Sequence, residues 1–393
     1  MTTNQAYIVA AVRTAGGKRK GALSGWHPAD MAGEVLNELV RRTGIDPVVI
    51  EDVIMGCVSQ AGEQSQQIGR SAVLASNLPQ SVPALTIDRQ CGSSQQAMQF
   101  AAQAVMAGMQ DVVIAAGVES MTRVPMGLPA WLPAKNGIGE GPWSARILDR
   151  YGITEFNQFT SAEMVADKHG LTREVLDAFS LESHRRAAQA TDAGAFAAEI
   201  LPLKVRDAGG AERLHDRDEG IRREASPEGM ASVEPIIEGG KLTAASASQM
   251  CDGASGVMIV SERALKAHGL TPIARLHSFA VTAGDPVIML EEPIRATRIA
   301  LEKARMKLGD IDLFEVNEAF ASIPLAWMKA LDVDPARTNA RGGAIALGHP
   351  LGATGTKLMT TLVHALRQTG QRWGLQTMCE GGGTANVTIV EAL

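Results

Sequence analysis

Hydrophobic residues recur along the chain in two patterns, short unbroken apolar runs and longer segments with helical spacing. In the first part of the chain, a helical pattern at 29–46 precedes apolar runs at 51–60 and 83–90, an Ala-rich helical segment at 93–109 and another apolar run at 111–120. Apolar runs without alternation, separated by helices, are typical of parallel strands that are buried on both faces. The pattern therefore predicts a layer built from βαβ units.

The same order of elements returns in the second part of the chain. A helical pattern at 291–312 precedes an apolar run at 312–320, the short segment 338–343, a helical pattern at 353–370 and an apolar run at 373–382. This correspondence predicts two similar halves, each built as an α/β layer.

One long insertion distinguishes the halves. The run at 373–382 turns through three glycines into 385–393, which predicts a hairpin that closes the second sheet. The matching run of the first half begins only at Cys251, because about 130 residues, from Thr122 to Met250, intervene. An insertion of this length usually serves function, so we expect a lid or a substrate-binding role.

The expected domain division follows from this insertion. Residues 1–121 and 250–270 would form the N-terminal half, residues 122–249 an inserted loop domain, and residues 271–393 the C-terminal half. The inserted domain would bind substrate and supply lid and oligomer contacts.

Composition and charge narrow the function classes. The 393 residues are too many for one ordinary domain, and 45% hydrophobic residues with 40 glycines fit an α/β protein with many tight turns. A net charge of -6 without a polybasic block argues against nucleic acid and anionic membranes as partners. No apolar window approaches the length of a transmembrane helix, and the first residues show no targeting pattern, so we expect a cytoplasmic protein.

The four cysteines form no C-x-x-C pair, which argues against a disulfide framework and a structural zinc site. They are Cys57, Cys91, Cys251 and Cys379. Cys91 differs from the others because it precedes the Ala-rich helix, whose free N–H groups and partial positive charge would favour a thiolate. We expect it to be a nucleophile. Arg89 would either add positive charge there or face solvent at a strand end.

A cysteine nucleophile needs a base, and His349 is the best of the eight histidines. It lies in the glycine-dense segment 342–355, where Pro350 delays the next helix. Such a loop costs conformational entropy, which favours a functional explanation. The other histidines lie in polar loops or on helical patterns beside charged residues, where we expect surface positions: His27, His169, His184, His215, His268, His277 and His364.

Two further segments carry candidate chemistry. Cys379 ends an apolar run and is followed by three glycines, which leave backbone N–H groups accessible. The segment 317–321 places an amide, a carboxylate and an aromatic ring after another apolar run. Ligands of α/β sheets collect at the carboxyl ends of strands, so both segments are candidates for a site.

Four motifs together resemble those of the thiolases, the acyl-CoA acetyltransferases. They are RQCGSSQQA at 89–97, VNEAFA at 316–321, GGAIALGHPLGATG at 342–355 and TMCEGGG at 377–383. The resemblance implies the thiolase-like α/β fold, in which two similar βαβαβαββ halves form a five-layered αβαβα structure with a loop domain inserted in the first half. It also implies a homodimer or homotetramer that uses coenzyme A as substrate and needs no metal or other cofactor.

The resemblance assigns a role to each matching catalytic residue. Cys91 would take up the acyl group as a thioester after activation by His349. Cys379 would be the second acid/base, which moves a proton to or from the acetyl methyl group. His349 and a water oriented by Asn317 would form one oxyanion hole, and the backbone N–H groups of Cys91 and Gly381 would form the other.

The same resemblance implies the contacts with coenzyme A. Ser248 would touch the pantetheine, Arg222 would pack by the adenine end, and Ala319 and Phe320 would line the pantetheine tunnel. The implied reaction is reversible thiolytic cleavage of a 3-ketoacyl-CoA, or Claisen condensation in the opposite direction, and the expected pathways are fatty acid metabolism and lipid degradation.

Some positions depart from the family pattern. Ser94 and Ala385 stand where many members have glycine, and neither change removes a catalytic atom. Asn157, Gln158 and Phe159 occupy positions where short-chain biosynthetic thiolases commonly have His-Met-Gly. Some degradative thiolases, including those acting on steroid side chains, are similar to this sequence there. We therefore expect an acyl pocket that accepts chains larger than acetoacetyl.

Two alternatives remain at this point. A thiolase-like chain could act as a lipid carrier without chemistry, or as a ketosynthase-type condensing enzyme. The complete set of Cys91, Asn317, His349 and Cys379 argues against the carrier. The second acid/base at Cys379 argues against the ketosynthase.

Overall fold

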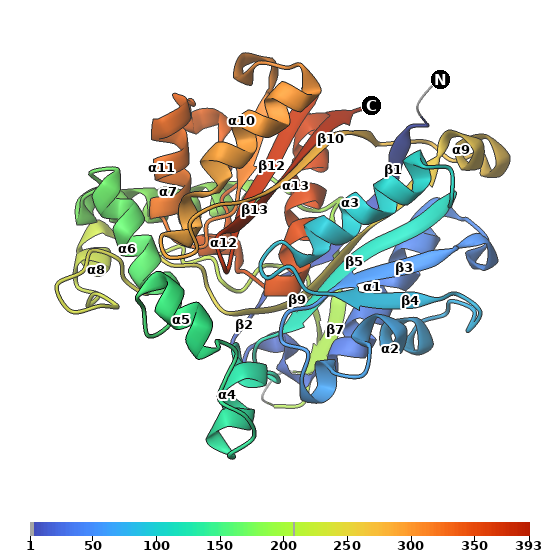
Figure 1. The fold of residues 1–393 in the computed structure, drawn as a ribbon. Helices are drawn as coiled ribbons and strands as arrows, with labels where there is room; N and C mark the ends of the chain where they lie inside the picture. The colour runs from blue at the N-terminus through green and yellow to red at the C-terminus, as the bar shows by residue number, and fades with distance from the viewer. Residues whose placement is uncertain (1–3, 207–208) are drawn as a thin grey trace.

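The chain folds into two similar α/β halves with a long segment inserted in the first (Figure 1). The computed structural model describes residues 4–206 and 209–393. Residues 1–3 and 207–208, which fall within the predicted first half and the predicted inserted domain, lie outside the described residues.

The first half has the predicted βαβαβαββ order. Its main elements are β1 (Ala6–Thr14), α1 (Pro28–Thr43), β3 (Asp52–Gly56), α2 (Ile68–Ala75), β4 (Ala84–Ile87), α3 (Ser93–Met106), β5 (Val112–Ser120) and β9 (Cys251–Ser261). A short β2 (Gly17–Lys18) pairs with β9, and α9 (Glu262–His268) leads into the second half.

The second half repeats this order, except that one strand is replaced by an isolated bridge. Its elements are β10 (Ala274–Ala283), α10 (Pro293–Ala304), β11 (Leu313–Val316), α11 (Ser322–Leu331), α12 (Ala344–Leu347), α13 (Thr354–Thr369), β12 (Trp373–Glu380) and β13 (Thr384–Ala392). The segment 338–343, which corresponds to β4, makes only an isolated parallel bridge from Thr338 to Phe314.

Both halves place their strands in the same order. The first sheet runs β4-β3-β5-β9-β1 and the second runs β10-β13-β12-β11, and antiparallel pairing of β1 with β10 joins the two sheets into one continuous sheet. The expectation of parallel strands is right for β4, β3 and β5 and for β11 and β12. β9 and β13 are antiparallel to both neighbours, as the hairpin predicted at 373–393 and its counterpart in the first half require. These strands are buried on both faces, so their unbroken apolar runs report burial and not direction.

Helices and sheets alternate in five layers, which confirms the predicted αβαβα arrangement (Figure 1). One core lies between the first sheet and helices α1 and α2, and another lies between the second sheet and helices α10 and α11. The central layer contains α3 and α13, which pack on each other and on both sheets. A Cβ atom on Gly355 of α13 would lie 2.0 Å from the backbone nitrogen of Gln95 in α3, so the close approach of these helices requires glycine.

The inserted segment leaves and re-enters the first sheet at neighbouring positions. Ser120, the last residue of β5, pairs with Asp252 of β9. In the second half the equivalent pair, Glu380 and Thr384, is joined by a three-glycine turn. The insertion therefore occupies the place of a hairpin turn and leaves the strand pairing unchanged. It contains α4 (Leu128–Lys135), α5 (Ala145–Tyr151), α6 (Gln158–Lys168), α7 (Arg173–Asp192), β6 (Ile200–Leu201), β7 (Leu203–Arg206), β8 (Glu212–His215) and α8 (Pro227–Ala231).

No helix within residues 4–206 and 209–393 has the length and apolar character needed to cross a bilayer.

Candidate active site

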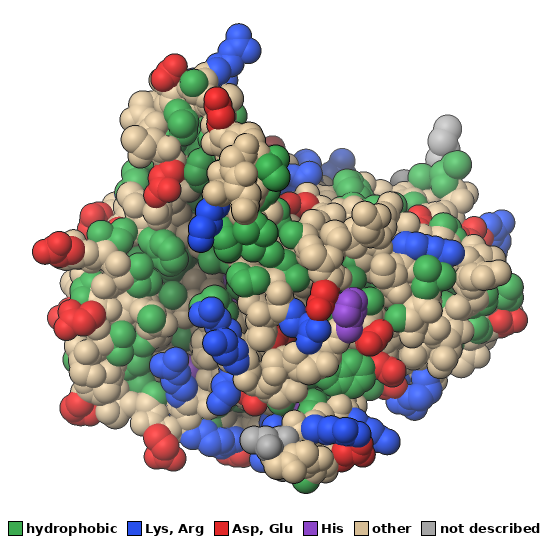
Figure 2. All heavy atoms as spheres, turned by 90° about the horizontal axis from the view of Figure 1, so that it is seen from below, with side chains coloured by type: hydrophobic (Ala, Val, Ile, Leu, Met, Phe, Trp, Pro, Cys, Tyr) green, Lys and Arg blue, Asp and Glu red, His purple; other side chains and the backbone are tan. Residues whose placement is uncertain are grey.

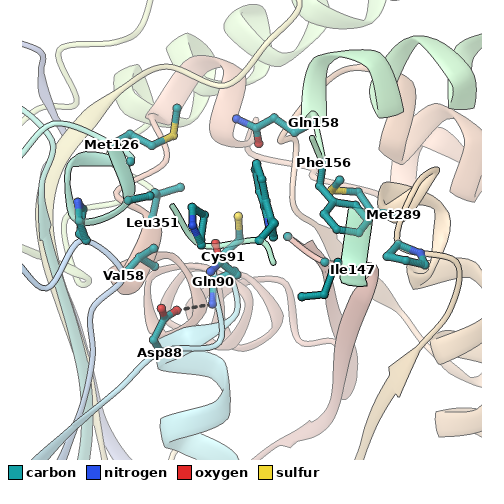
Figure 3. Close-up of a pocket in the computed structure, with 18 of the residues that line it drawn as sticks. Val58, Asp88, Gln90, Cys91, Met126, Ile147, Phe156, Gln158, Met289 and Leu351 are labelled. Atoms are coloured by element: carbon teal, nitrogen blue, oxygen red, sulfur yellow. Dashed lines mark hydrogen bonds between the residues drawn. The ribbon is translucent and has the colours of Figure 1, made fainter. Parts of the chain in front are cut away.

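Cys91 lies in a sharp turn between β4 and α3. Gln90, directly before it, has a φ of 48°, in the left-handed region that non-glycine residues seldom adopt. Asp88 Oδ1 accepts a hydrogen bond from the Gln90 backbone N–H at 2.6 Å (Figure 3). The Ser93 hydroxyl accepts from the Arg89 N–H at 2.9 Å and donates to the Gln90 carbonyl at 2.6 Å. These bonds stabilise the turn that presents the thiol to a cavity (Figure 3).

The expectation that the helix terminus holds Cys91 as a thiolate is wrong for this structure. Helix α3 begins at Ser93 with Gly92 as its N-cap, so Cys91 lies outside the helix end. Burial, and then the nearby Glu380 carboxylate, raise the pKa of Cys91 to about 12. Cys91 is therefore a neutral thiol at rest, and its ionisation has to accompany proton transfer to a base.

His349 is buried in the loop between α12 and α13, and Thr354 determines its tautomer. The Thr354 hydroxyl donates to the Pro350 carbonyl at 2.9 Å, so its oxygen accepts from His349 Nδ1–H, 2.6 Å away. The Nε2 atom is thereby left unprotonated, and it accepts a hydrogen bond of 3.4 Å from Asn317 Nδ2. Burial, with a smaller contribution from Lys357, lowers the pKa of His349 to about 3. A neutral imidazole with an unprotonated Nε2 is the form that can accept a proton.

Asn317 follows β11, and its side chain is only partly satisfied. The residue is buried and its Oδ1 has no hydrogen-bond partner among the described residues. Buried polar atoms are nearly always paired, so this oxygen is available to a water or to a substrate group.

Cys379 is fully buried near the end of β12. Burial, and then the charge that Cys91 would carry, raise its pKa well above the ordinary value. The two thiols are therefore close enough to interact electrostatically. Cys379 also packs in the same apolar cluster as Ala319 and Phe320. The structure thus brings the residues from the four motifs to one place.

A cavity of about 550 Å³ begins at Cys91 and His349 and carries the residues expected to contact coenzyme A. Arg222, Ser248, Ala319 and Phe320 all line it. Figure 2 shows basic side chains beside hydrophobic side chains around a hollow in the face seen from below.

A short backbone pairing joins the two segments that form this cavity. The Ser248 N–H donates to the Ala319 carbonyl at 2.9 Å, and Ala247 forms an antiparallel bridge with Phe320. The end of the inserted segment is therefore fixed to the loop that follows β11.

A second cavity, of about 1050 Å³, also opens on Cys91. Gly381 lines it beside the thiol. In Figure 3 the Cys91 side chain lies between Leu351 and Met126 on one side and Phe156 and Met289 on the other. Most of the remaining lining is apolar as well and includes Pro129, Ala130, Trp143, Ile147 and Tyr151. Cys91 therefore lies where a polar-ended cavity and a large apolar cavity meet.

The three positions that depart from the short-chain pattern have different roles. Asn157 caps α6 by accepting from the Phe159 and Thr160 N–H groups at 2.9 and 3.2 Å. Gln158 lines both cavities (Figure 3). Phe159 lines the smaller cavity and packs edge-on against Phe320, with ring centroids 5.7 Å apart.

Sequence reasoning missed several residues that position the site. Thr354 fixes the His349 ring, and the Gln249 carbonyl accepts from the His349 N–H at 3.0 Å. Lys357 Nζ donates to the Leu347 and Gly348 carbonyls at 2.6 and 2.8 Å, directly before His349. Thr354 could have been found from the sequence, because its hydroxyl follows the candidate His349 by five residues. The roles of Gln249 and Lys357 depend on tertiary contacts that the sequence does not show. Lys18 and Arg19, which line the smaller cavity, belong to a run of three basic residues at 18–20 that was visible in the sequence.

The expectation that the remaining histidines lie on the surface is wrong for three of them. His184, His215 and His364 are buried, and each uses a ring nitrogen to bond a backbone group. Among residues 4–206 and 209–393 no group of three or more His, Cys, Asp or Glu side chains could hold a metal ion.

Comparison with known proteins agrees with this architecture. The family model described as the thiolase N-terminal domain matches residues 6–263, and the thiolase C-terminal domain matches residues 270–392. The chain is 50% identical over 390 residues to a steroid 3-ketoacyl-CoA thiolase of Mycobacterium tuberculosis, covering 99% of this chain and 94% of the relative. It is 40% identical to a 3-ketoacyl-CoA thiolase of Aliivibrio fischeri, with 98% of each chain covered. The crystal structure of the Bacillus anthracis acetyl-CoA acetyltransferase superposes with a TM-score of 0.90 at 34% identity, over 100% of this chain and 99% of that one.

Proposed function

Because the chain belongs to the thiolase family, we propose that it cleaves 3-ketoacyl-CoA thioesters with acyl groups larger than acetoacetyl, through an acyl thioester on Cys91. The protein is an acyl-CoA thiolase and acts on coenzyme A and acyl-CoA thioesters. The family matches do not favour a non-catalytic carrier or a ketosynthase. The roles of the individual residues and the identity of the acyl group are proposals.

In the first half-reaction the Cys91 sulfur attacks the 3-keto carbon while its proton passes to His349 Nε2. The bond between C2 and C3 then breaks, and its electron pair stays on C2 of the departing acetyl-CoA. Cys379 protonates this carbon, so that acetyl-CoA leaves and the shortened acyl group remains on Cys91. In the second half-reaction the thiol of coenzyme A gives its proton to the Cys379 thiolate and takes the acyl group, and the departing Cys91 sulfur regains its proton from His349, as in other covalent mechanisms.

Negative charge develops on two different carbonyl oxygens during this sequence. The orphaned Oδ1 of Asn317 supports a bound water that, with His349, would stabilise the oxygen of the acetyl-CoA enolate. The backbone N–H groups of Cys91 and Gly381, two residues that line the larger cavity, would stabilise the oxygen of the attacked ketone. A hydrogen-bond donor that points at such an oxyanion lowers the activation free energy by about 3 kcal/mol. Two sites are needed because the two charges appear at different places.

The observation that carries the substrate proposal is the position of Cys91 between the two cavities. The smaller cavity contains the residues expected to contact coenzyme A, including Arg222 and Ser248. The larger cavity is mostly apolar, and its volume of about 1050 Å³ is at the upper end for sites that enclose drug-sized ligands. The relative at 50% identity is named a steroid 3-ketoacyl-CoA thiolase, which supports a polycyclic acyl group as the occupant.

The experiment that tests this proposal is a thiolysis assay with a graded series of 3-ketoacyl-CoA thioesters. The series would run from acetoacetyl-CoA through long straight chains to a steroid side-chain thioester. We expect kcat/KM to rise with the size of the acyl group. A sharp preference for acetoacetyl-CoA would contradict the proposal.

We also propose a division into residues 1–121 with 250–270, 122–249 and 271–393, a homodimer or homotetramer, a cytoplasmic location, and no requirement for a metal or a further cofactor. Light scattering on the purified protein would measure the number of subunits.

A further inference from the structure

Glu380 is a buried carboxyl group that the proposed mechanism does not use. It follows Cys379 at the end of β12 and has 0% of its surface exposed. The Thr384 hydroxyl donates to Glu380 Oε2 at 2.6 Å, whereas Oε1 has no hydrogen-bond partner among the described residues. A buried carboxylate with one unpaired oxygen is costly, so its position calls for an explanation.

The unpaired oxygen faces the turn that carries Cys91. A Cβ atom on Gly92 would lie 1.9 Å from Glu380 Oε1, so only glycine leaves room for the carboxyl group there. From the neighbouring strand β13, Asn386 Nδ2 donates to the Gly92 carbonyl at 3.3 Å and keeps the turn beside Glu380. A carboxyl group from the second half is thus held against the residue that follows Cys91 in the first half.

The charged and titratable groups around Glu380 are few. Asp88 and Arg89 face it from the turn before α3, and the Cys91 thiol lies on the same turn. On its own strand the neighbour is Cys379, and Thr384, the β13 residue that pairs with it, is uncharged. Arg89 favours the carboxylate and Asp88 opposes it, but within residues 4–206 and 209–393 Arg89 Nε has no hydrogen-bond partner and Glu380 forms no ion pair.

Both protonation states of Glu380 are accessible at neutral pH. Burial is the largest effect and raises the pKa of Glu380 to about 7. The carboxylate is in turn the largest charge effect that raises the pKa of Cys91. The charge of Glu380 therefore changes close to pH 7, and the pKa of Cys91 changes with it.

We propose that Glu380 acts through Cys91 as a positioning residue whose carboxylate keeps the nucleophile protonated in the free enzyme. The inference rests on the proposed role of Cys91 as nucleophile. When Glu380 is protonated or its charge is removed, the thiolate forms at lower pH. In this role the carboxyl group takes no covalent part in the reaction.

The test is the rate at which iodoacetamide alkylates Cys91, followed by mass spectrometry of the peptide that contains it, across a pH series. In Glu380→Gln we expect alkylation at about pH 8 to be at least about tenfold faster than in the wild type, which corresponds to one pKa unit. Glu391→Gln removes a buried carboxylate at the other end of the same hairpin and should leave the rate unchanged. An unchanged or slower rate in Glu380→Gln would overturn the proposal.

A second variant keeps the carboxyl group in place. Thr384→Val removes the hydrogen bond that lowers the pKa of Glu380, so the inflection in the alkylation profile should move to higher pH. An inflection that does not move would also overturn the proposal. Acylation of Cys91 by substrate is measured separately on the wild-type enzyme, so a failure of the proposed function is distinguishable from a failure of this inference.

Discussion

His349 Nδ1 lies 2.6 Å from the hydroxyl oxygen of Thr354, and that hydroxyl donates its own hydrogen to the Pro350 carbonyl. The arrangement leaves one tautomer, in which Nε2 is free to accept a proton. Thr354 therefore occupies the place of the third residue of a catalytic triad, which hydrogen-bonds to the histidine and fixes its orientation.

Replacement of Thr354 by valine should therefore impair chemistry more than binding. Loss of a buried hydrogen-bond partner costs about 1–3 kcal/mol, which corresponds to a decrease in kcat of about fivefold to 150-fold. The KM for coenzyme A should change little, because Thr354 does not line the cavity that carries the coenzyme A residues. Steady-state kinetics of Thr354→Val beside Thr354→Ser, which keeps the hydroxyl, would measure the effect; equal kcat values in the two variants would count against this role.

The larger cavity should determine which acyl groups are accepted. Ala130 of α4 lines it, whereas Ala134 of the same helix does not. Ala130→Trp should lower kcat/KM for long-chain and polycyclic 3-ketoacyl-CoA thioesters by at least about tenfold, since one buried methylene in a pocket already contributes about 1–3 kcal/mol. Acetoacetyl-CoA should be cleaved at the wild-type rate. Ala134→Trp is the matched control, and the same selectivity in both variants would refute the assignment of this cavity.

The buried His184 should make stability depend on pH. Burial, and then Arg222, lower the pKa of His184 to about 4, and its Nδ1 accepts the Arg222 N–H at 3.1 Å. Because the unfolded histidine titrates near pH 6.5, the unfolded state binds more protons below that value, and the folded state loses stability as pH falls from about 6.5 to about 4. The loss from this group is at most about 3 kcal/mol.

Urea unfolding of the wild type and His184→Gln at several pH values would measure this contribution. We expect the difference in the free energy of unfolding to shift in favour of the variant as pH falls across that window. A difference that does not depend on pH would show that His184 is not neutral in the folded state.

Much of the fold followed from local patterns. The order of apolar runs and helical segments indicated two similar halves, and the glycines at 381–383 indicated the hairpin between β12 and β13. Strand direction depended on that turn, because the apolar runs of β9 and β13 alone show the same unbroken pattern as parallel strands buried on both faces. The segment at Thr338 has the same place in the order of elements as β4, but it pairs only through an isolated bridge, which the order of elements could not show.

The site was predictable to the extent that its residues lie in short motifs. Cys91, Asn317, His349 and Cys379 could be found in this way. Their electrostatics could not, because the raised pKa of Cys91 depends on burial and on a carboxylate almost 300 residues away in the sequence. Such effects arise only when both halves are folded together.

The central claim is that the acyl group is carried on the sulfur of Cys91, and mass spectrometry of the enzyme after incubation with acetyl-CoA tests it most directly. We predict one acetyl group on the Cys91 peptide of the wild type and of Cys379→Ser, with slower exchange of the acetyl α-protons in Cys379→Ser, and no acetyl group on Cys91→Ser. An acetyl group on another residue, or normal turnover by Cys91→Ser, would contradict the account.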